Sequence, residues 1–420
     1  MAKALQPVRG THDILPSEYP EFDHVIRTAQ EVASRYGYAR MDTPIFEFSE
    51  VFHRPLGDTS DIVSKETYSL EDRGGESLTL RPESTAPVVR AFLSNGLQQY
   101  VPFKAFYAGP QFRYERPQKG RQRQFNQFGC ELLGAEAWEA DVETIALAQH
   151  MLQALGVAED IELQLNSLGD AESRANYREA LVGYLANYKD SLSEDSLVRL
   201  EKNPLRILDS KAPEDQDIVK AAPDIAEYMN ESSRDFFARV QDGLAALDIP
   251  FTINPRLVRG MDYYNHSVFE FVTNKLGSQG TVLAGGRYNG LVEMMGGQQT
   301  AGIGFAAGVE RLVGLREAME VTPAHNPTPL VTLVPMGDTH ETTCWKLAQT
   351  LRHEGLVVEI AYRGKPAKRM QRADKAGIAY AVMIGDDEAA ANEVTLKEFA
   401  SGEQQRIAQE ALAKTLLNKQ

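Results

Sequence analysis

The chain has 420 residues, of which 43% are apolar, so it can bury large cores and suggests two to three domains. Its net charge of −15 excludes a protein that coats nucleic acid through a basic surface, but not an RNA partner met by local basic patches. The start MAKALQPVRG lacks the apolar core of a signal peptide and no later run could span a bilayer, so we expect a cytoplasmic protein with no membrane segment.

The first predicted element is an amphipathic helix from Glu21 to Ser34, because apolar side chains recur at helical spacing along FDHVIRTAQEVAS. The next stretch, YARMDTPIFEF, is typical of an extended strand. Pro44 removes a main-chain donor there, which confines the strand to the edge of a sheet or to an interface.

The region from Val101 to Gly134 predicts a β-hairpin with a long polar tip, RPQKGRQR. Strand alternation gathers the polar side chains on one face: Gln111, Arg113 and Glu115 from the first strand, with Gln127 and Glu131 from the second, opposite Phe128, Cys130 and Leu132. A guanidinium fork suits a phosphate, and carboxylates or amides suit an ammonium or a polar ring. The alternative is a solvated hairpin with surface ion pairs.

Between residues 170 and 248, charged residues follow helical spacing in SRANYREALVGYLANY and SSRDFFARVQDGLAAL. A strand pattern precedes this region and resumes at IPFTINPRLV. We therefore predict a helical insertion within a mostly β domain.

Two further stretches carry polar groups that packing alone does not require. LVRGMDYYNHSVFEF places Arg259 beside Tyr263 and Tyr264, and a buried salt bridge with packed tyrosines is the alternative to a binding site. AGIGFAAGVERL is rich in small residues and ends in Arg311. Its glycines (Gly302, Gly304 and Gly308) would let a planar ligand approach the backbone, or would serve tight helix-on-sheet packing.

After the Pro-rich HNPTP, strands alternate with helices, which predicts βαβ units in a separate small domain at residues 330–420. The basic helix KPAKRMQRADKAG lies within it. The last predicted elements are a short strand over EVTL and one helix over EQQRIAQEALAKTLLN.

Together these motifs resemble the class II aminoacyl-tRNA synthetases. The first helix and strand, FRYERPQKGRQRQFNQFGCELLG and GIGFAAGVERL resemble motifs one, two and three of that class, and LVRGMDYYN and AGGRYNGL resemble two signature segments of histidyl-tRNA synthetase. The opening RGTHDILP and TLRPESTAPVVRAF also match. The resemblance implies an α+β class II catalytic domain, an antiparallel sheet flanked by helices, at residues 1–325, with the insertion at 170–248. It also implies a C-terminal α/β (βαβαβ) anticodon-binding domain at 330–420.

The resemblance also implies an ATP-dependent histidine–tRNA ligase that forms histidyl-adenylate and then charges histidine tRNA, with Mg²⁺ as cofactor. Arg113 and Arg259 would be catalytic, acting at the α-phosphate. The ATP-binding residues would be Arg113, Glu115, Arg121, Arg123 and Arg311. The histidine-binding residues would be Glu83, Thr85, Gln127, Glu131, Arg259, Tyr263, Tyr264 and Tyr288.

Further expectations concern the macromolecular partners. Arg116 and Gln118, at the tip of motif two, would read the acceptor end of the tRNA, and motif one, from Phe22 to Phe48, would form a homodimer interface. We also expect the insertion to contact the acceptor arm and to be dispensable for adenylate formation.

Two rival interpretations follow from the same resemblance. One is a non-catalytic, synthetase-like regulatory subunit of histidine biosynthesis, and the retained arginines and last domain argue against it. The other is a class II synthetase for another amino acid, or an adenylating enzyme that acts without tRNA. The paired tyrosines in RGMDYYN and the Glu131–Tyr264 combination argue against that one.

Overall fold

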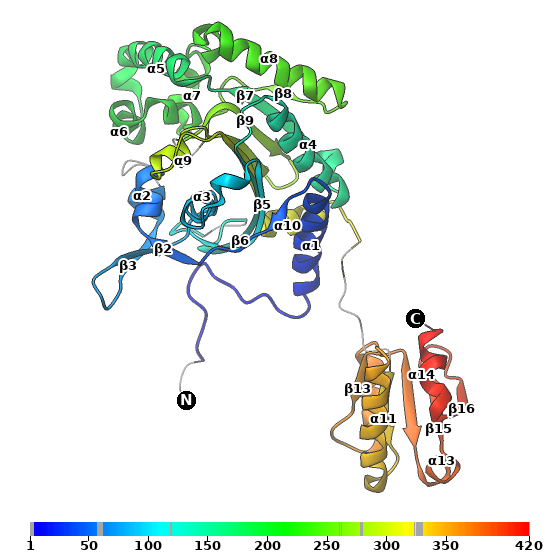
Figure 1. Cartoon of the computed structure of the whole chain (residues 1–420). Helices are drawn as coiled ribbons and strands as arrows, with labels where there is room; N and C mark the ends of the chain where they lie inside the picture. Colours follow the sequence, from blue (N-terminus) through cyan, green and yellow to red (C-terminus); the bar gives the residue numbers. More distant parts are fainter. Residues whose placement is uncertain are drawn as a thin grey trace. The chain divides into compact units, whose positions relative to one another are not determined.

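The structure is a computed structural model that describes residues 4–56, 62–117, 120–259, 261, 263–277, 280–322, 324 and 331–419. The chain divides into two compact units, Met1–Ala324 and His325–Gln420 (Figure 1). Among the described residues, no helix is long and apolar enough to cross a membrane.

The first unit alternates helices and strands along most of its length. Its helices are α1 (Tyr19–Arg35), α2 (Glu50–Leu56), α3 (Thr85–Ser94), α4 (Glu139–Ala154), α5 (Ala171–Leu185), α6 (Glu194–Lys202), α7 (Pro213–Lys220), α8 (Glu231–Ala246), α9 (Leu291–Met294) and α10 (Val309–Ala318). Shorter helical turns are η1 (Ile62–Glu66), η2 (Leu97–Tyr100), η3 (Ala158–Asp160), η4 (Ala186–Ser191), η5 (Pro204–Asp209) and η6 (Ile225–Tyr228). The strands are β1 (Ala39–Arg40), β2 (Phe46–Phe48), β3 (Tyr68–Glu71), β4 (Ser77–Leu80), β5 (Phe103–Phe112), β6 (Gln124–Leu133), β7 (Glu162–Ser167), β8 (Thr252–Ile253), β9 (Asn265–Val272), β10 (Thr281–Arg287) and β11 (Gly302–Gly308).

The main sheet, in the part of the chain that the structure describes, has eight strands in the order β1-β5-β6-β11-β10-β9-β7-β8. The pairs from β5 through to β7 are antiparallel, while β1 and β8 add parallel edges. Strands β5 and β6 form the predicted hairpin. The motif-three strand β11 lies directly beside β6, so segments far apart in the sequence share the centre of the sheet.

The two faces of this sheet are chemically different, as the alternation in β6 predicts. Phe128, Cys130 and Leu132 join a core that also contains apolar side chains of α1, α4 and α10. Gln127 and Glu131 point to the other face. Helices α1, α4 and α10 therefore cover one face (Figure 1), and the polar residues of the hairpin are left to build a site on the opposite one.

The predicted helix from Glu21 to Ser34 is confirmed as α1, but the strand predicted after it divides into two. Strand β1 is one edge strand of the main sheet and pairs with β5. Strand β2 belongs to a second sheet, in the order β2-β4-β3. Pro44 lies between β1 and β2, and the chain changes sheets there.

The helical insertion is also confirmed, since helices α5 to α8 follow β7 and precede β8 along the chain (Figure 1). Its core is formed by buried side chains that include Tyr177, Leu181 and Ile207. Asp215 ties several of its turns together by accepting hydrogen bonds from the main chain of Ser193 and from neighbouring hydroxyl groups.

The second unit is the predicted α/β domain, with one error at its C-terminal end. Its elements are β12 (Val331–Pro335), η7 (Asp338–His340), α11 (Glu341–His353), β13 (Val358–Ile360), α12 (Pro366–Lys375), β14 (Tyr380–Ile384), α13 (Asp386–Ala391), β15 (Glu393–Glu398), β16 (Gln404–Ala408) and α14 (Gln409–Leu417). The order β13-β12-β14-β15-β16 is parallel in its first three strands, as βαβαβ predicts. The single helix predicted over EQQRIAQEALAKTLLN is wrong in its first part, because Gln404–Ala408 pair with β15 instead.

Candidate active site

A cavity of about 330 Å³ lies on the polar face of the main sheet. Its lining residues come from the hairpin, from β9 to β11, from the start of α3, from the helical insertion and from the segment before β9. They are Glu83, Thr85, Tyr107, Arg113, Glu115, Gly120, Arg121, Gln122, Phe125, Gln127, Asp209, Lys211, Arg259, Met261, Tyr264, Glu270, Thr281, Val282, Leu283, Ala284, Ala306, Gly308, Glu310 and Arg311. A volume of this size suits a small organic substrate.

One wall of the cavity is the start of helix α3. The buried carboxylate of Glu83 accepts hydrogen bonds from the main-chain N–H groups of Thr85 (2.6 Å) and Ala86 (2.9 Å). A carboxylate at this position satisfies orphan donors and faces the positive end of the helix dipole. Burial nevertheless raises the pKa of Glu83, although these hydrogen bonds oppose the rise.

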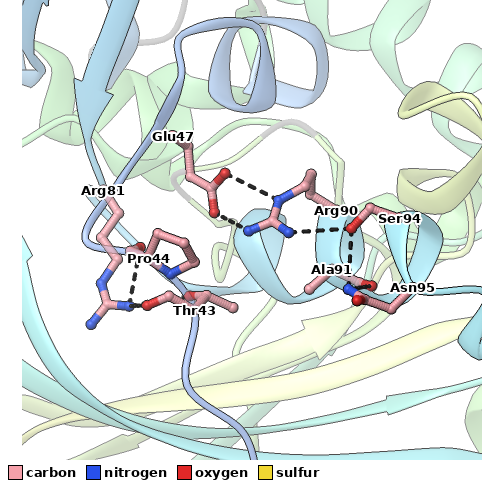
Figure 2. A network of polar contacts seen from close by, with 8 residues as sticks. All are labelled: Thr43, Pro44, Glu47, Arg81, Arg90, Ala91, Ser94 and Asn95. Atoms are coloured by element: carbon pink, nitrogen blue, oxygen red, sulfur yellow. Dashed lines mark hydrogen bonds and ion pairs between the residues drawn. The ribbon is translucent and has the colours of Figure 1, made fainter.

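Two arginines attach this wall to the segment around strand β2 (Figure 2). Nη1 of Arg81 donates to the main-chain oxygen and the hydroxyl of Thr43, at 2.8 and 3.1 Å, and its Nε donates to the Pro110 carbonyl. Arg90, on α3, forms a two-point ion pair with Glu47, whose side chain is buried. A two-point guanidinium–carboxylate pair fixes orientation as well as distance. Arg90 therefore fixes helix α3 against β2, and Arg81 fixes the segment before α3 against β5 of the main sheet.

Thr85, Tyr107 and Tyr264 line the inner end of the cavity, and behind them Glu131 is the centre of a buried hydrogen-bond network. Glu131, Tyr263 and Tyr288 are not themselves lining residues. Its Oε1 accepts from the Thr85 hydroxyl (2.6 Å) and the Tyr107 hydroxyl (3.4 Å), and its Oε2 accepts from Tyr288. Tyr288 also contacts the rings of Tyr263 and Tyr264, with centroids 5.7 and 6.3 Å away. The structure thus brings Glu131 and the three predicted tyrosines together, with Tyr288 directly bonded to the carboxylate.

The glycines of β11 differ in role from one another. A Cβ atom at Gly304 would overlap Oε2 of Glu131, and one at Gly302 would overlap the ring of Tyr288. These two glycines therefore accommodate side chains of the protein, and a planar ligand cannot lie against them. Gly308, further along the same face, lines the cavity and remains available for a ligand.

Arginines also line the cavity, and Arg113 lies next to the wall that carries Glu83. Arg113 donates to the Pro82 carbonyl at 2.9 Å and lies 5.3 Å from the ring centre of Phe125. Glu115 is 3.1 Å from Arg121 and 3.9 Å from Arg113. Burial lowers the pKa of Arg311, and the positive charges of Arg121 and Arg113 lower it further. Such a concentration of positive charge favours an anionic ligand with several oxygens.

Arg259 forms the salt bridge that the sequence left open as an alternative, with a partner that no motif indicates. Its guanidinium group pairs with Glu270 of β9, and Glu270 in turn accepts a hydrogen bond from Thr281 at 2.9 Å. Burial acts to lower the pKa of Arg259, but Glu270 and the nearby phenols raise it overall. Arg259 is therefore a permanent cation held at the cavity wall.

Three buried polar atoms of lining residues have no hydrogen-bond partner within the described residues: Nε of Arg259, Oε1 of Gln127 and Oε2 of Glu115, of which the last lies 3.1 Å from Arg121 in an ion pair. Unpaired buried polar atoms cost free energy, and they are retained where a ligand completes them. The first is a donor that suits a phosphate or carboxylate oxygen. The second is an acceptor that suits an ammonium group.

Some predicted residues lie elsewhere. Arg123 does not line the cavity; its guanidinium group lies 3.9 Å from the ring centre of Tyr114, and its Nε donates to the Glu115 carbonyl. Arg116 is exposed and also lies outside the lining, and Gln118 falls outside the described residues.

Several cavity residues were missed by the sequence analysis. Glu270 could have been found, because it alternates with the buried Phe269 and Phe271 and must face the cavity side of β9. Asp209 and Lys211 belong to no recognisable motif, and they line the cavity only because the insertion folds back toward it.

The protonation of Glu131 provides a test of the network. Burial raises the pKa of Glu131 to about 8, the Thr85 and Tyr288 hydrogen bonds oppose this, and the Glu83 charge adds to it. Between its ordinary pKa and this raised one, the carboxyl group of Glu131 is still protonated in the native chain but ionised in the unfolded chain. The contribution of Glu131 to the free energy of unfolding is therefore fully present at low pH and is lost as the pH rises from about 5 to about 8. Relative to Glu131→Gln, the free energy of unfolding should fall by up to about 1.4 kcal/mol per pH unit in this window. Urea titrations of both proteins across the window measure it, and parallel curves would contradict the shift.

The sequence and the fold of this chain match those of known proteins. Residues 10–312 match the family model of histidyl-tRNA synthetase, and residues 330–419 match that of an anticodon binding domain. The chain is 56% identical over 404 residues to the histidine–tRNA ligase of Rhodospirillum rubrum, covering 96% of each chain. It is 52% identical over 412 residues to that of Gluconobacter oxydans, covering 98% of each. The solved histidyl-tRNA synthetase of S. aureus matches with a TM-score of 0.84 at 34% identity, over 98% of this chain and 100% of that one. The chain therefore belongs to the histidyl-tRNA synthetase family.

Proposed function

We propose that the chain is an ATP-dependent ligase that converts L-histidine and ATP into histidyl-adenylate and pyrophosphate, and then transfers histidine to the 3′ end of histidine tRNA. The observation that carries this proposal is the cavity itself: its lining combines the unpaired Oε1 of Gln127 and Thr85, which bonds to Glu131, with a group of arginines. The product, histidine attached to its tRNA, is used in translation. The proposed compartment is therefore the cytoplasm.

In the first step, a carboxylate oxygen of histidine attacks the α-phosphorus of ATP, a new oxygen–phosphorus bond forms and pyrophosphate leaves. No general base is needed, because the attacking group is already an anion. Negative charge builds on the phosphoryl oxygens, and preorganised guanidinium groups stabilise it. Arg113 and Arg259 have this role in the proposal. Arg311 and Arg121 would hold the distal phosphates, with Glu115 orienting Arg113 and Arg121. Arg123, bonded beside Tyr114, would reach ATP only if the motif-two loop moves.

Histidine itself is assigned to the inner end of the cavity. Glu83, Thr85 and Gln127 would hold its ammonium group, since they offer two acceptors and a hydroxyl around one wall. Glu131 and Tyr264 would bracket the imidazole nitrogens, and Tyr263 and Tyr288 would line the ring, with Tyr288 also orienting Glu131. A site that hydrogen-bonds a polar side chain rejects analogues by roughly 10⁴ to 10⁵.

Mg²⁺ would accompany ATP. Mg²⁺ prefers oxygen ligands and is commonly held by one or two carboxylates together with substrate phosphates. Glu115 and Glu310 line the cavity and could supply such oxygens, although Glu310 also accepts hydrogen bonds from Asn126 at 2.8 and 3.0 Å. The donor set thus fits the ion, whose role would be to neutralise phosphate charge.

The same proposal assigns a function to each part of the chain. Residues 1–325 would form the catalytic domain, with the insertion at 170–248, and residues 330–420 would bind the anticodon. The second unit carries a basic group on and before α12, consisting of Arg363, Lys365, Lys368, Arg369 and Arg372. Arg369 and Arg372 already donate to main-chain carbonyls of their own loop, at 2.6 Å each, so Arg363, Lys365 and Lys368 are better placed for RNA phosphates.

The experiment that tests this function is ATP–pyrophosphate exchange with each of the twenty amino acids. We expect exchange that depends on histidine alone. Exchange with a different amino acid would mean that the pocket is misassigned. No exchange at all would favour a regulatory, non-catalytic relative instead.

The tip of motif two is expected to contact tRNA rather than ATP. Arg116→Ala and Gln118→Ala should each lower the rate of tRNA charging by about tenfold, the scale of one lost base or phosphate contact. The exchange rate should not change, because Arg116 is exposed and lies outside the cavity. Equal losses in both assays would contradict this assignment.

We also propose a homodimer through the segment from Phe22 to Phe48. Apolar side chains are exposed there, with Ile45, Phe46 and Phe48 at 44%, 55% and 57% exposure. A cluster of this kind is typical of an interface. Sedimentation should give a dimer at micromolar concentration, and Phe46→Glu with Phe48→Glu should give monomers. A monomeric unsubstituted chain would refute the proposal.

A further inference from the structure

The helical insertion reaches the catalytic cavity. Its turn η5 and the residues that follow it bring Asp209 and Lys211 into the cavity lining. Ile207 and Leu208, in the same turn, are buried in the core that the insertion shares with Leu257 and Tyr264. The turn is therefore anchored by apolar packing directly before these two polar residues.

Within this turn, Arg206 makes a direct contact with the segment that carries Arg259. Nη1 of Arg206 donates a hydrogen bond to the main-chain carbonyl oxygen of Arg259 at 3.2 Å. Two residues earlier, Nδ2 of Asn166 donates to the Leu257 carbonyl at 3.0 Å. The main chain of this segment is thus held from the insertion as well as from strand β7.

The side chain of Arg259 is held from a different direction, by Glu270 of β9. Its position in the cavity therefore depends on two restraints. One fixes the guanidinium group, and the other fixes the peptide from which the side chain extends. Loss of the second leaves the ion pair in place but allows the backbone to shift, and a displacement near 1 Å of a catalytic group can cost about a hundredfold in rate.

We infer that the helical insertion takes part in adenylate formation, and that Arg206 is the residue through which it positions Arg259. This inference rests on the proposed function and deepens it. It differs from the expectation drawn from the sequence, in which the insertion serves only the tRNA. Deleting the insertion would remove Arg206, and exchange would fall together with tRNA charging.

The test compares single substitutions in the full-length chain. Arg206→Met should lower kcat for histidine-dependent exchange by roughly tenfold to a hundredfold, with KM for ATP and histidine changed by less than about threefold. Arg206→Lys should recover most of kcat, because an ammonium group can also donate to the Arg259 carbonyl.

Two control variants separate positioning from general loosening of the insertion. Arg256, three residues before Arg259, donates to the carbonyls of Lys220, Ala222 and Pro223, so Arg256→Met loosens the insertion from the same segment but keeps the bond to the Arg259 carbonyl. It should lower the melting temperature at least as much as Arg206→Met, with a smaller loss of kcat. Arg178→Met, at an exposed position on α5, should match the unsubstituted chain in both.

The outcomes are distinct. Unchanged kcat in Arg206→Met, or an equal loss in Arg256→Met, would overturn the inference while leaving the proposed function intact. Histidine-dependent exchange by the unsubstituted chain is measured first, and its absence would overturn both.

Discussion

Replacing Arg259 by methionine should reduce kcat for histidine-dependent ATP–pyrophosphate exchange by roughly 10²- to 10³-fold, the range found for a lost electrostatic contact in a preorganised site. The guanidinium group is mostly buried and is oriented by Glu270, and its Nε has no partner among the described residues. It is therefore ready to meet charge that develops at the phosphorus. Steady-state exchange kinetics with separate kcat and KM values measure the effect.

The substitution also leaves the partly buried carboxylate of Glu270, 18% exposed, without its counter-ion, and that loss would itself disturb the cavity. The double variant Arg259→Met with Glu270→Gln removes this complication, because a neutral amide keeps its hydrogen bond with Thr281. If Arg259 acts on the transition state, the double variant stays as slow as the single one. Recovery to within tenfold of the unsubstituted rate would show that the loss came from the stranded carboxylate.

The contrast between Arg259 and Glu270 shows what the sequence could predict about the site. Arg259 was found because its motif is local: arginine, aspartate and two tyrosines stand within a few residues of one another. Glu270 is a single polar residue in an apolar strand, and its importance arises only when β9 and β10 pair and bring Thr281 beside it. Arg206 is more remote still, since no pattern in a charged helical region distinguishes one arginine from another.

The glycines of β11 give a second example. The sequence shows that small residues are required at Gly302 and Gly304, but it does not show what occupies the space. Pairing of β11 with β6 places Gly304 opposite Glu131, and the carboxylate then folds across the glycine. The need for a small residue was predictable from residue type, whereas the identity of the side chain that fills the space depended on how β11 and β6 pair.

At the level of the fold, periodic elements were predicted and the exceptions have tertiary causes. Helix α1 and the β5–β6 hairpin follow their hydrophobic patterns. Gln404–Ala408 carry residues that also suit a helix, but hydrogen bonding with β15 extends the sheet and overrides that preference. The strand after α1 divides because Pro44 cannot continue a ladder, and β2 pairs with β4 beyond it.

Replacing Arg287 by methionine should destabilise the first unit by about 3–5 kcal/mol, because it leaves Asp141 as an uncompensated buried charge. Both side chains are fully buried. Nε of Arg287 donates to Asp141 at 2.9 Å, and the guanidinium group also donates to the carbonyls of Ala135 and Ala137 at 3.0 and 3.2 Å. Arg287 thus joins strand β10 to the start of helix α4.

The two tryptophans of the chain allow the free energy of unfolding of the first unit to be measured separately from that of the second. Trp138 directly precedes α4, next to Ala137, and Trp345 lies in the second unit with 55% exposure. In a Trp345→Phe background, urea unfolding followed by Trp138 fluorescence reports the unit that contains Arg287. The exposed pair Arg27–Asp23 supplies the control, and Arg27→Met should change the free energy of unfolding by less than about 0.5 kcal/mol.

Asp141→Asn combined with Arg287→Met separates the charge from the packing. If an unpaired carboxylate causes the loss, the double variant should regain about half of it or more, since the amide carries no charge to bury. A double variant no more stable than Arg287→Met would instead assign the loss to the carbonyls of Ala135 and Ala137. Because Tyr288 follows Arg287 and bonds to Glu131, the same variants should raise KM for histidine in proportion to the stability they lose.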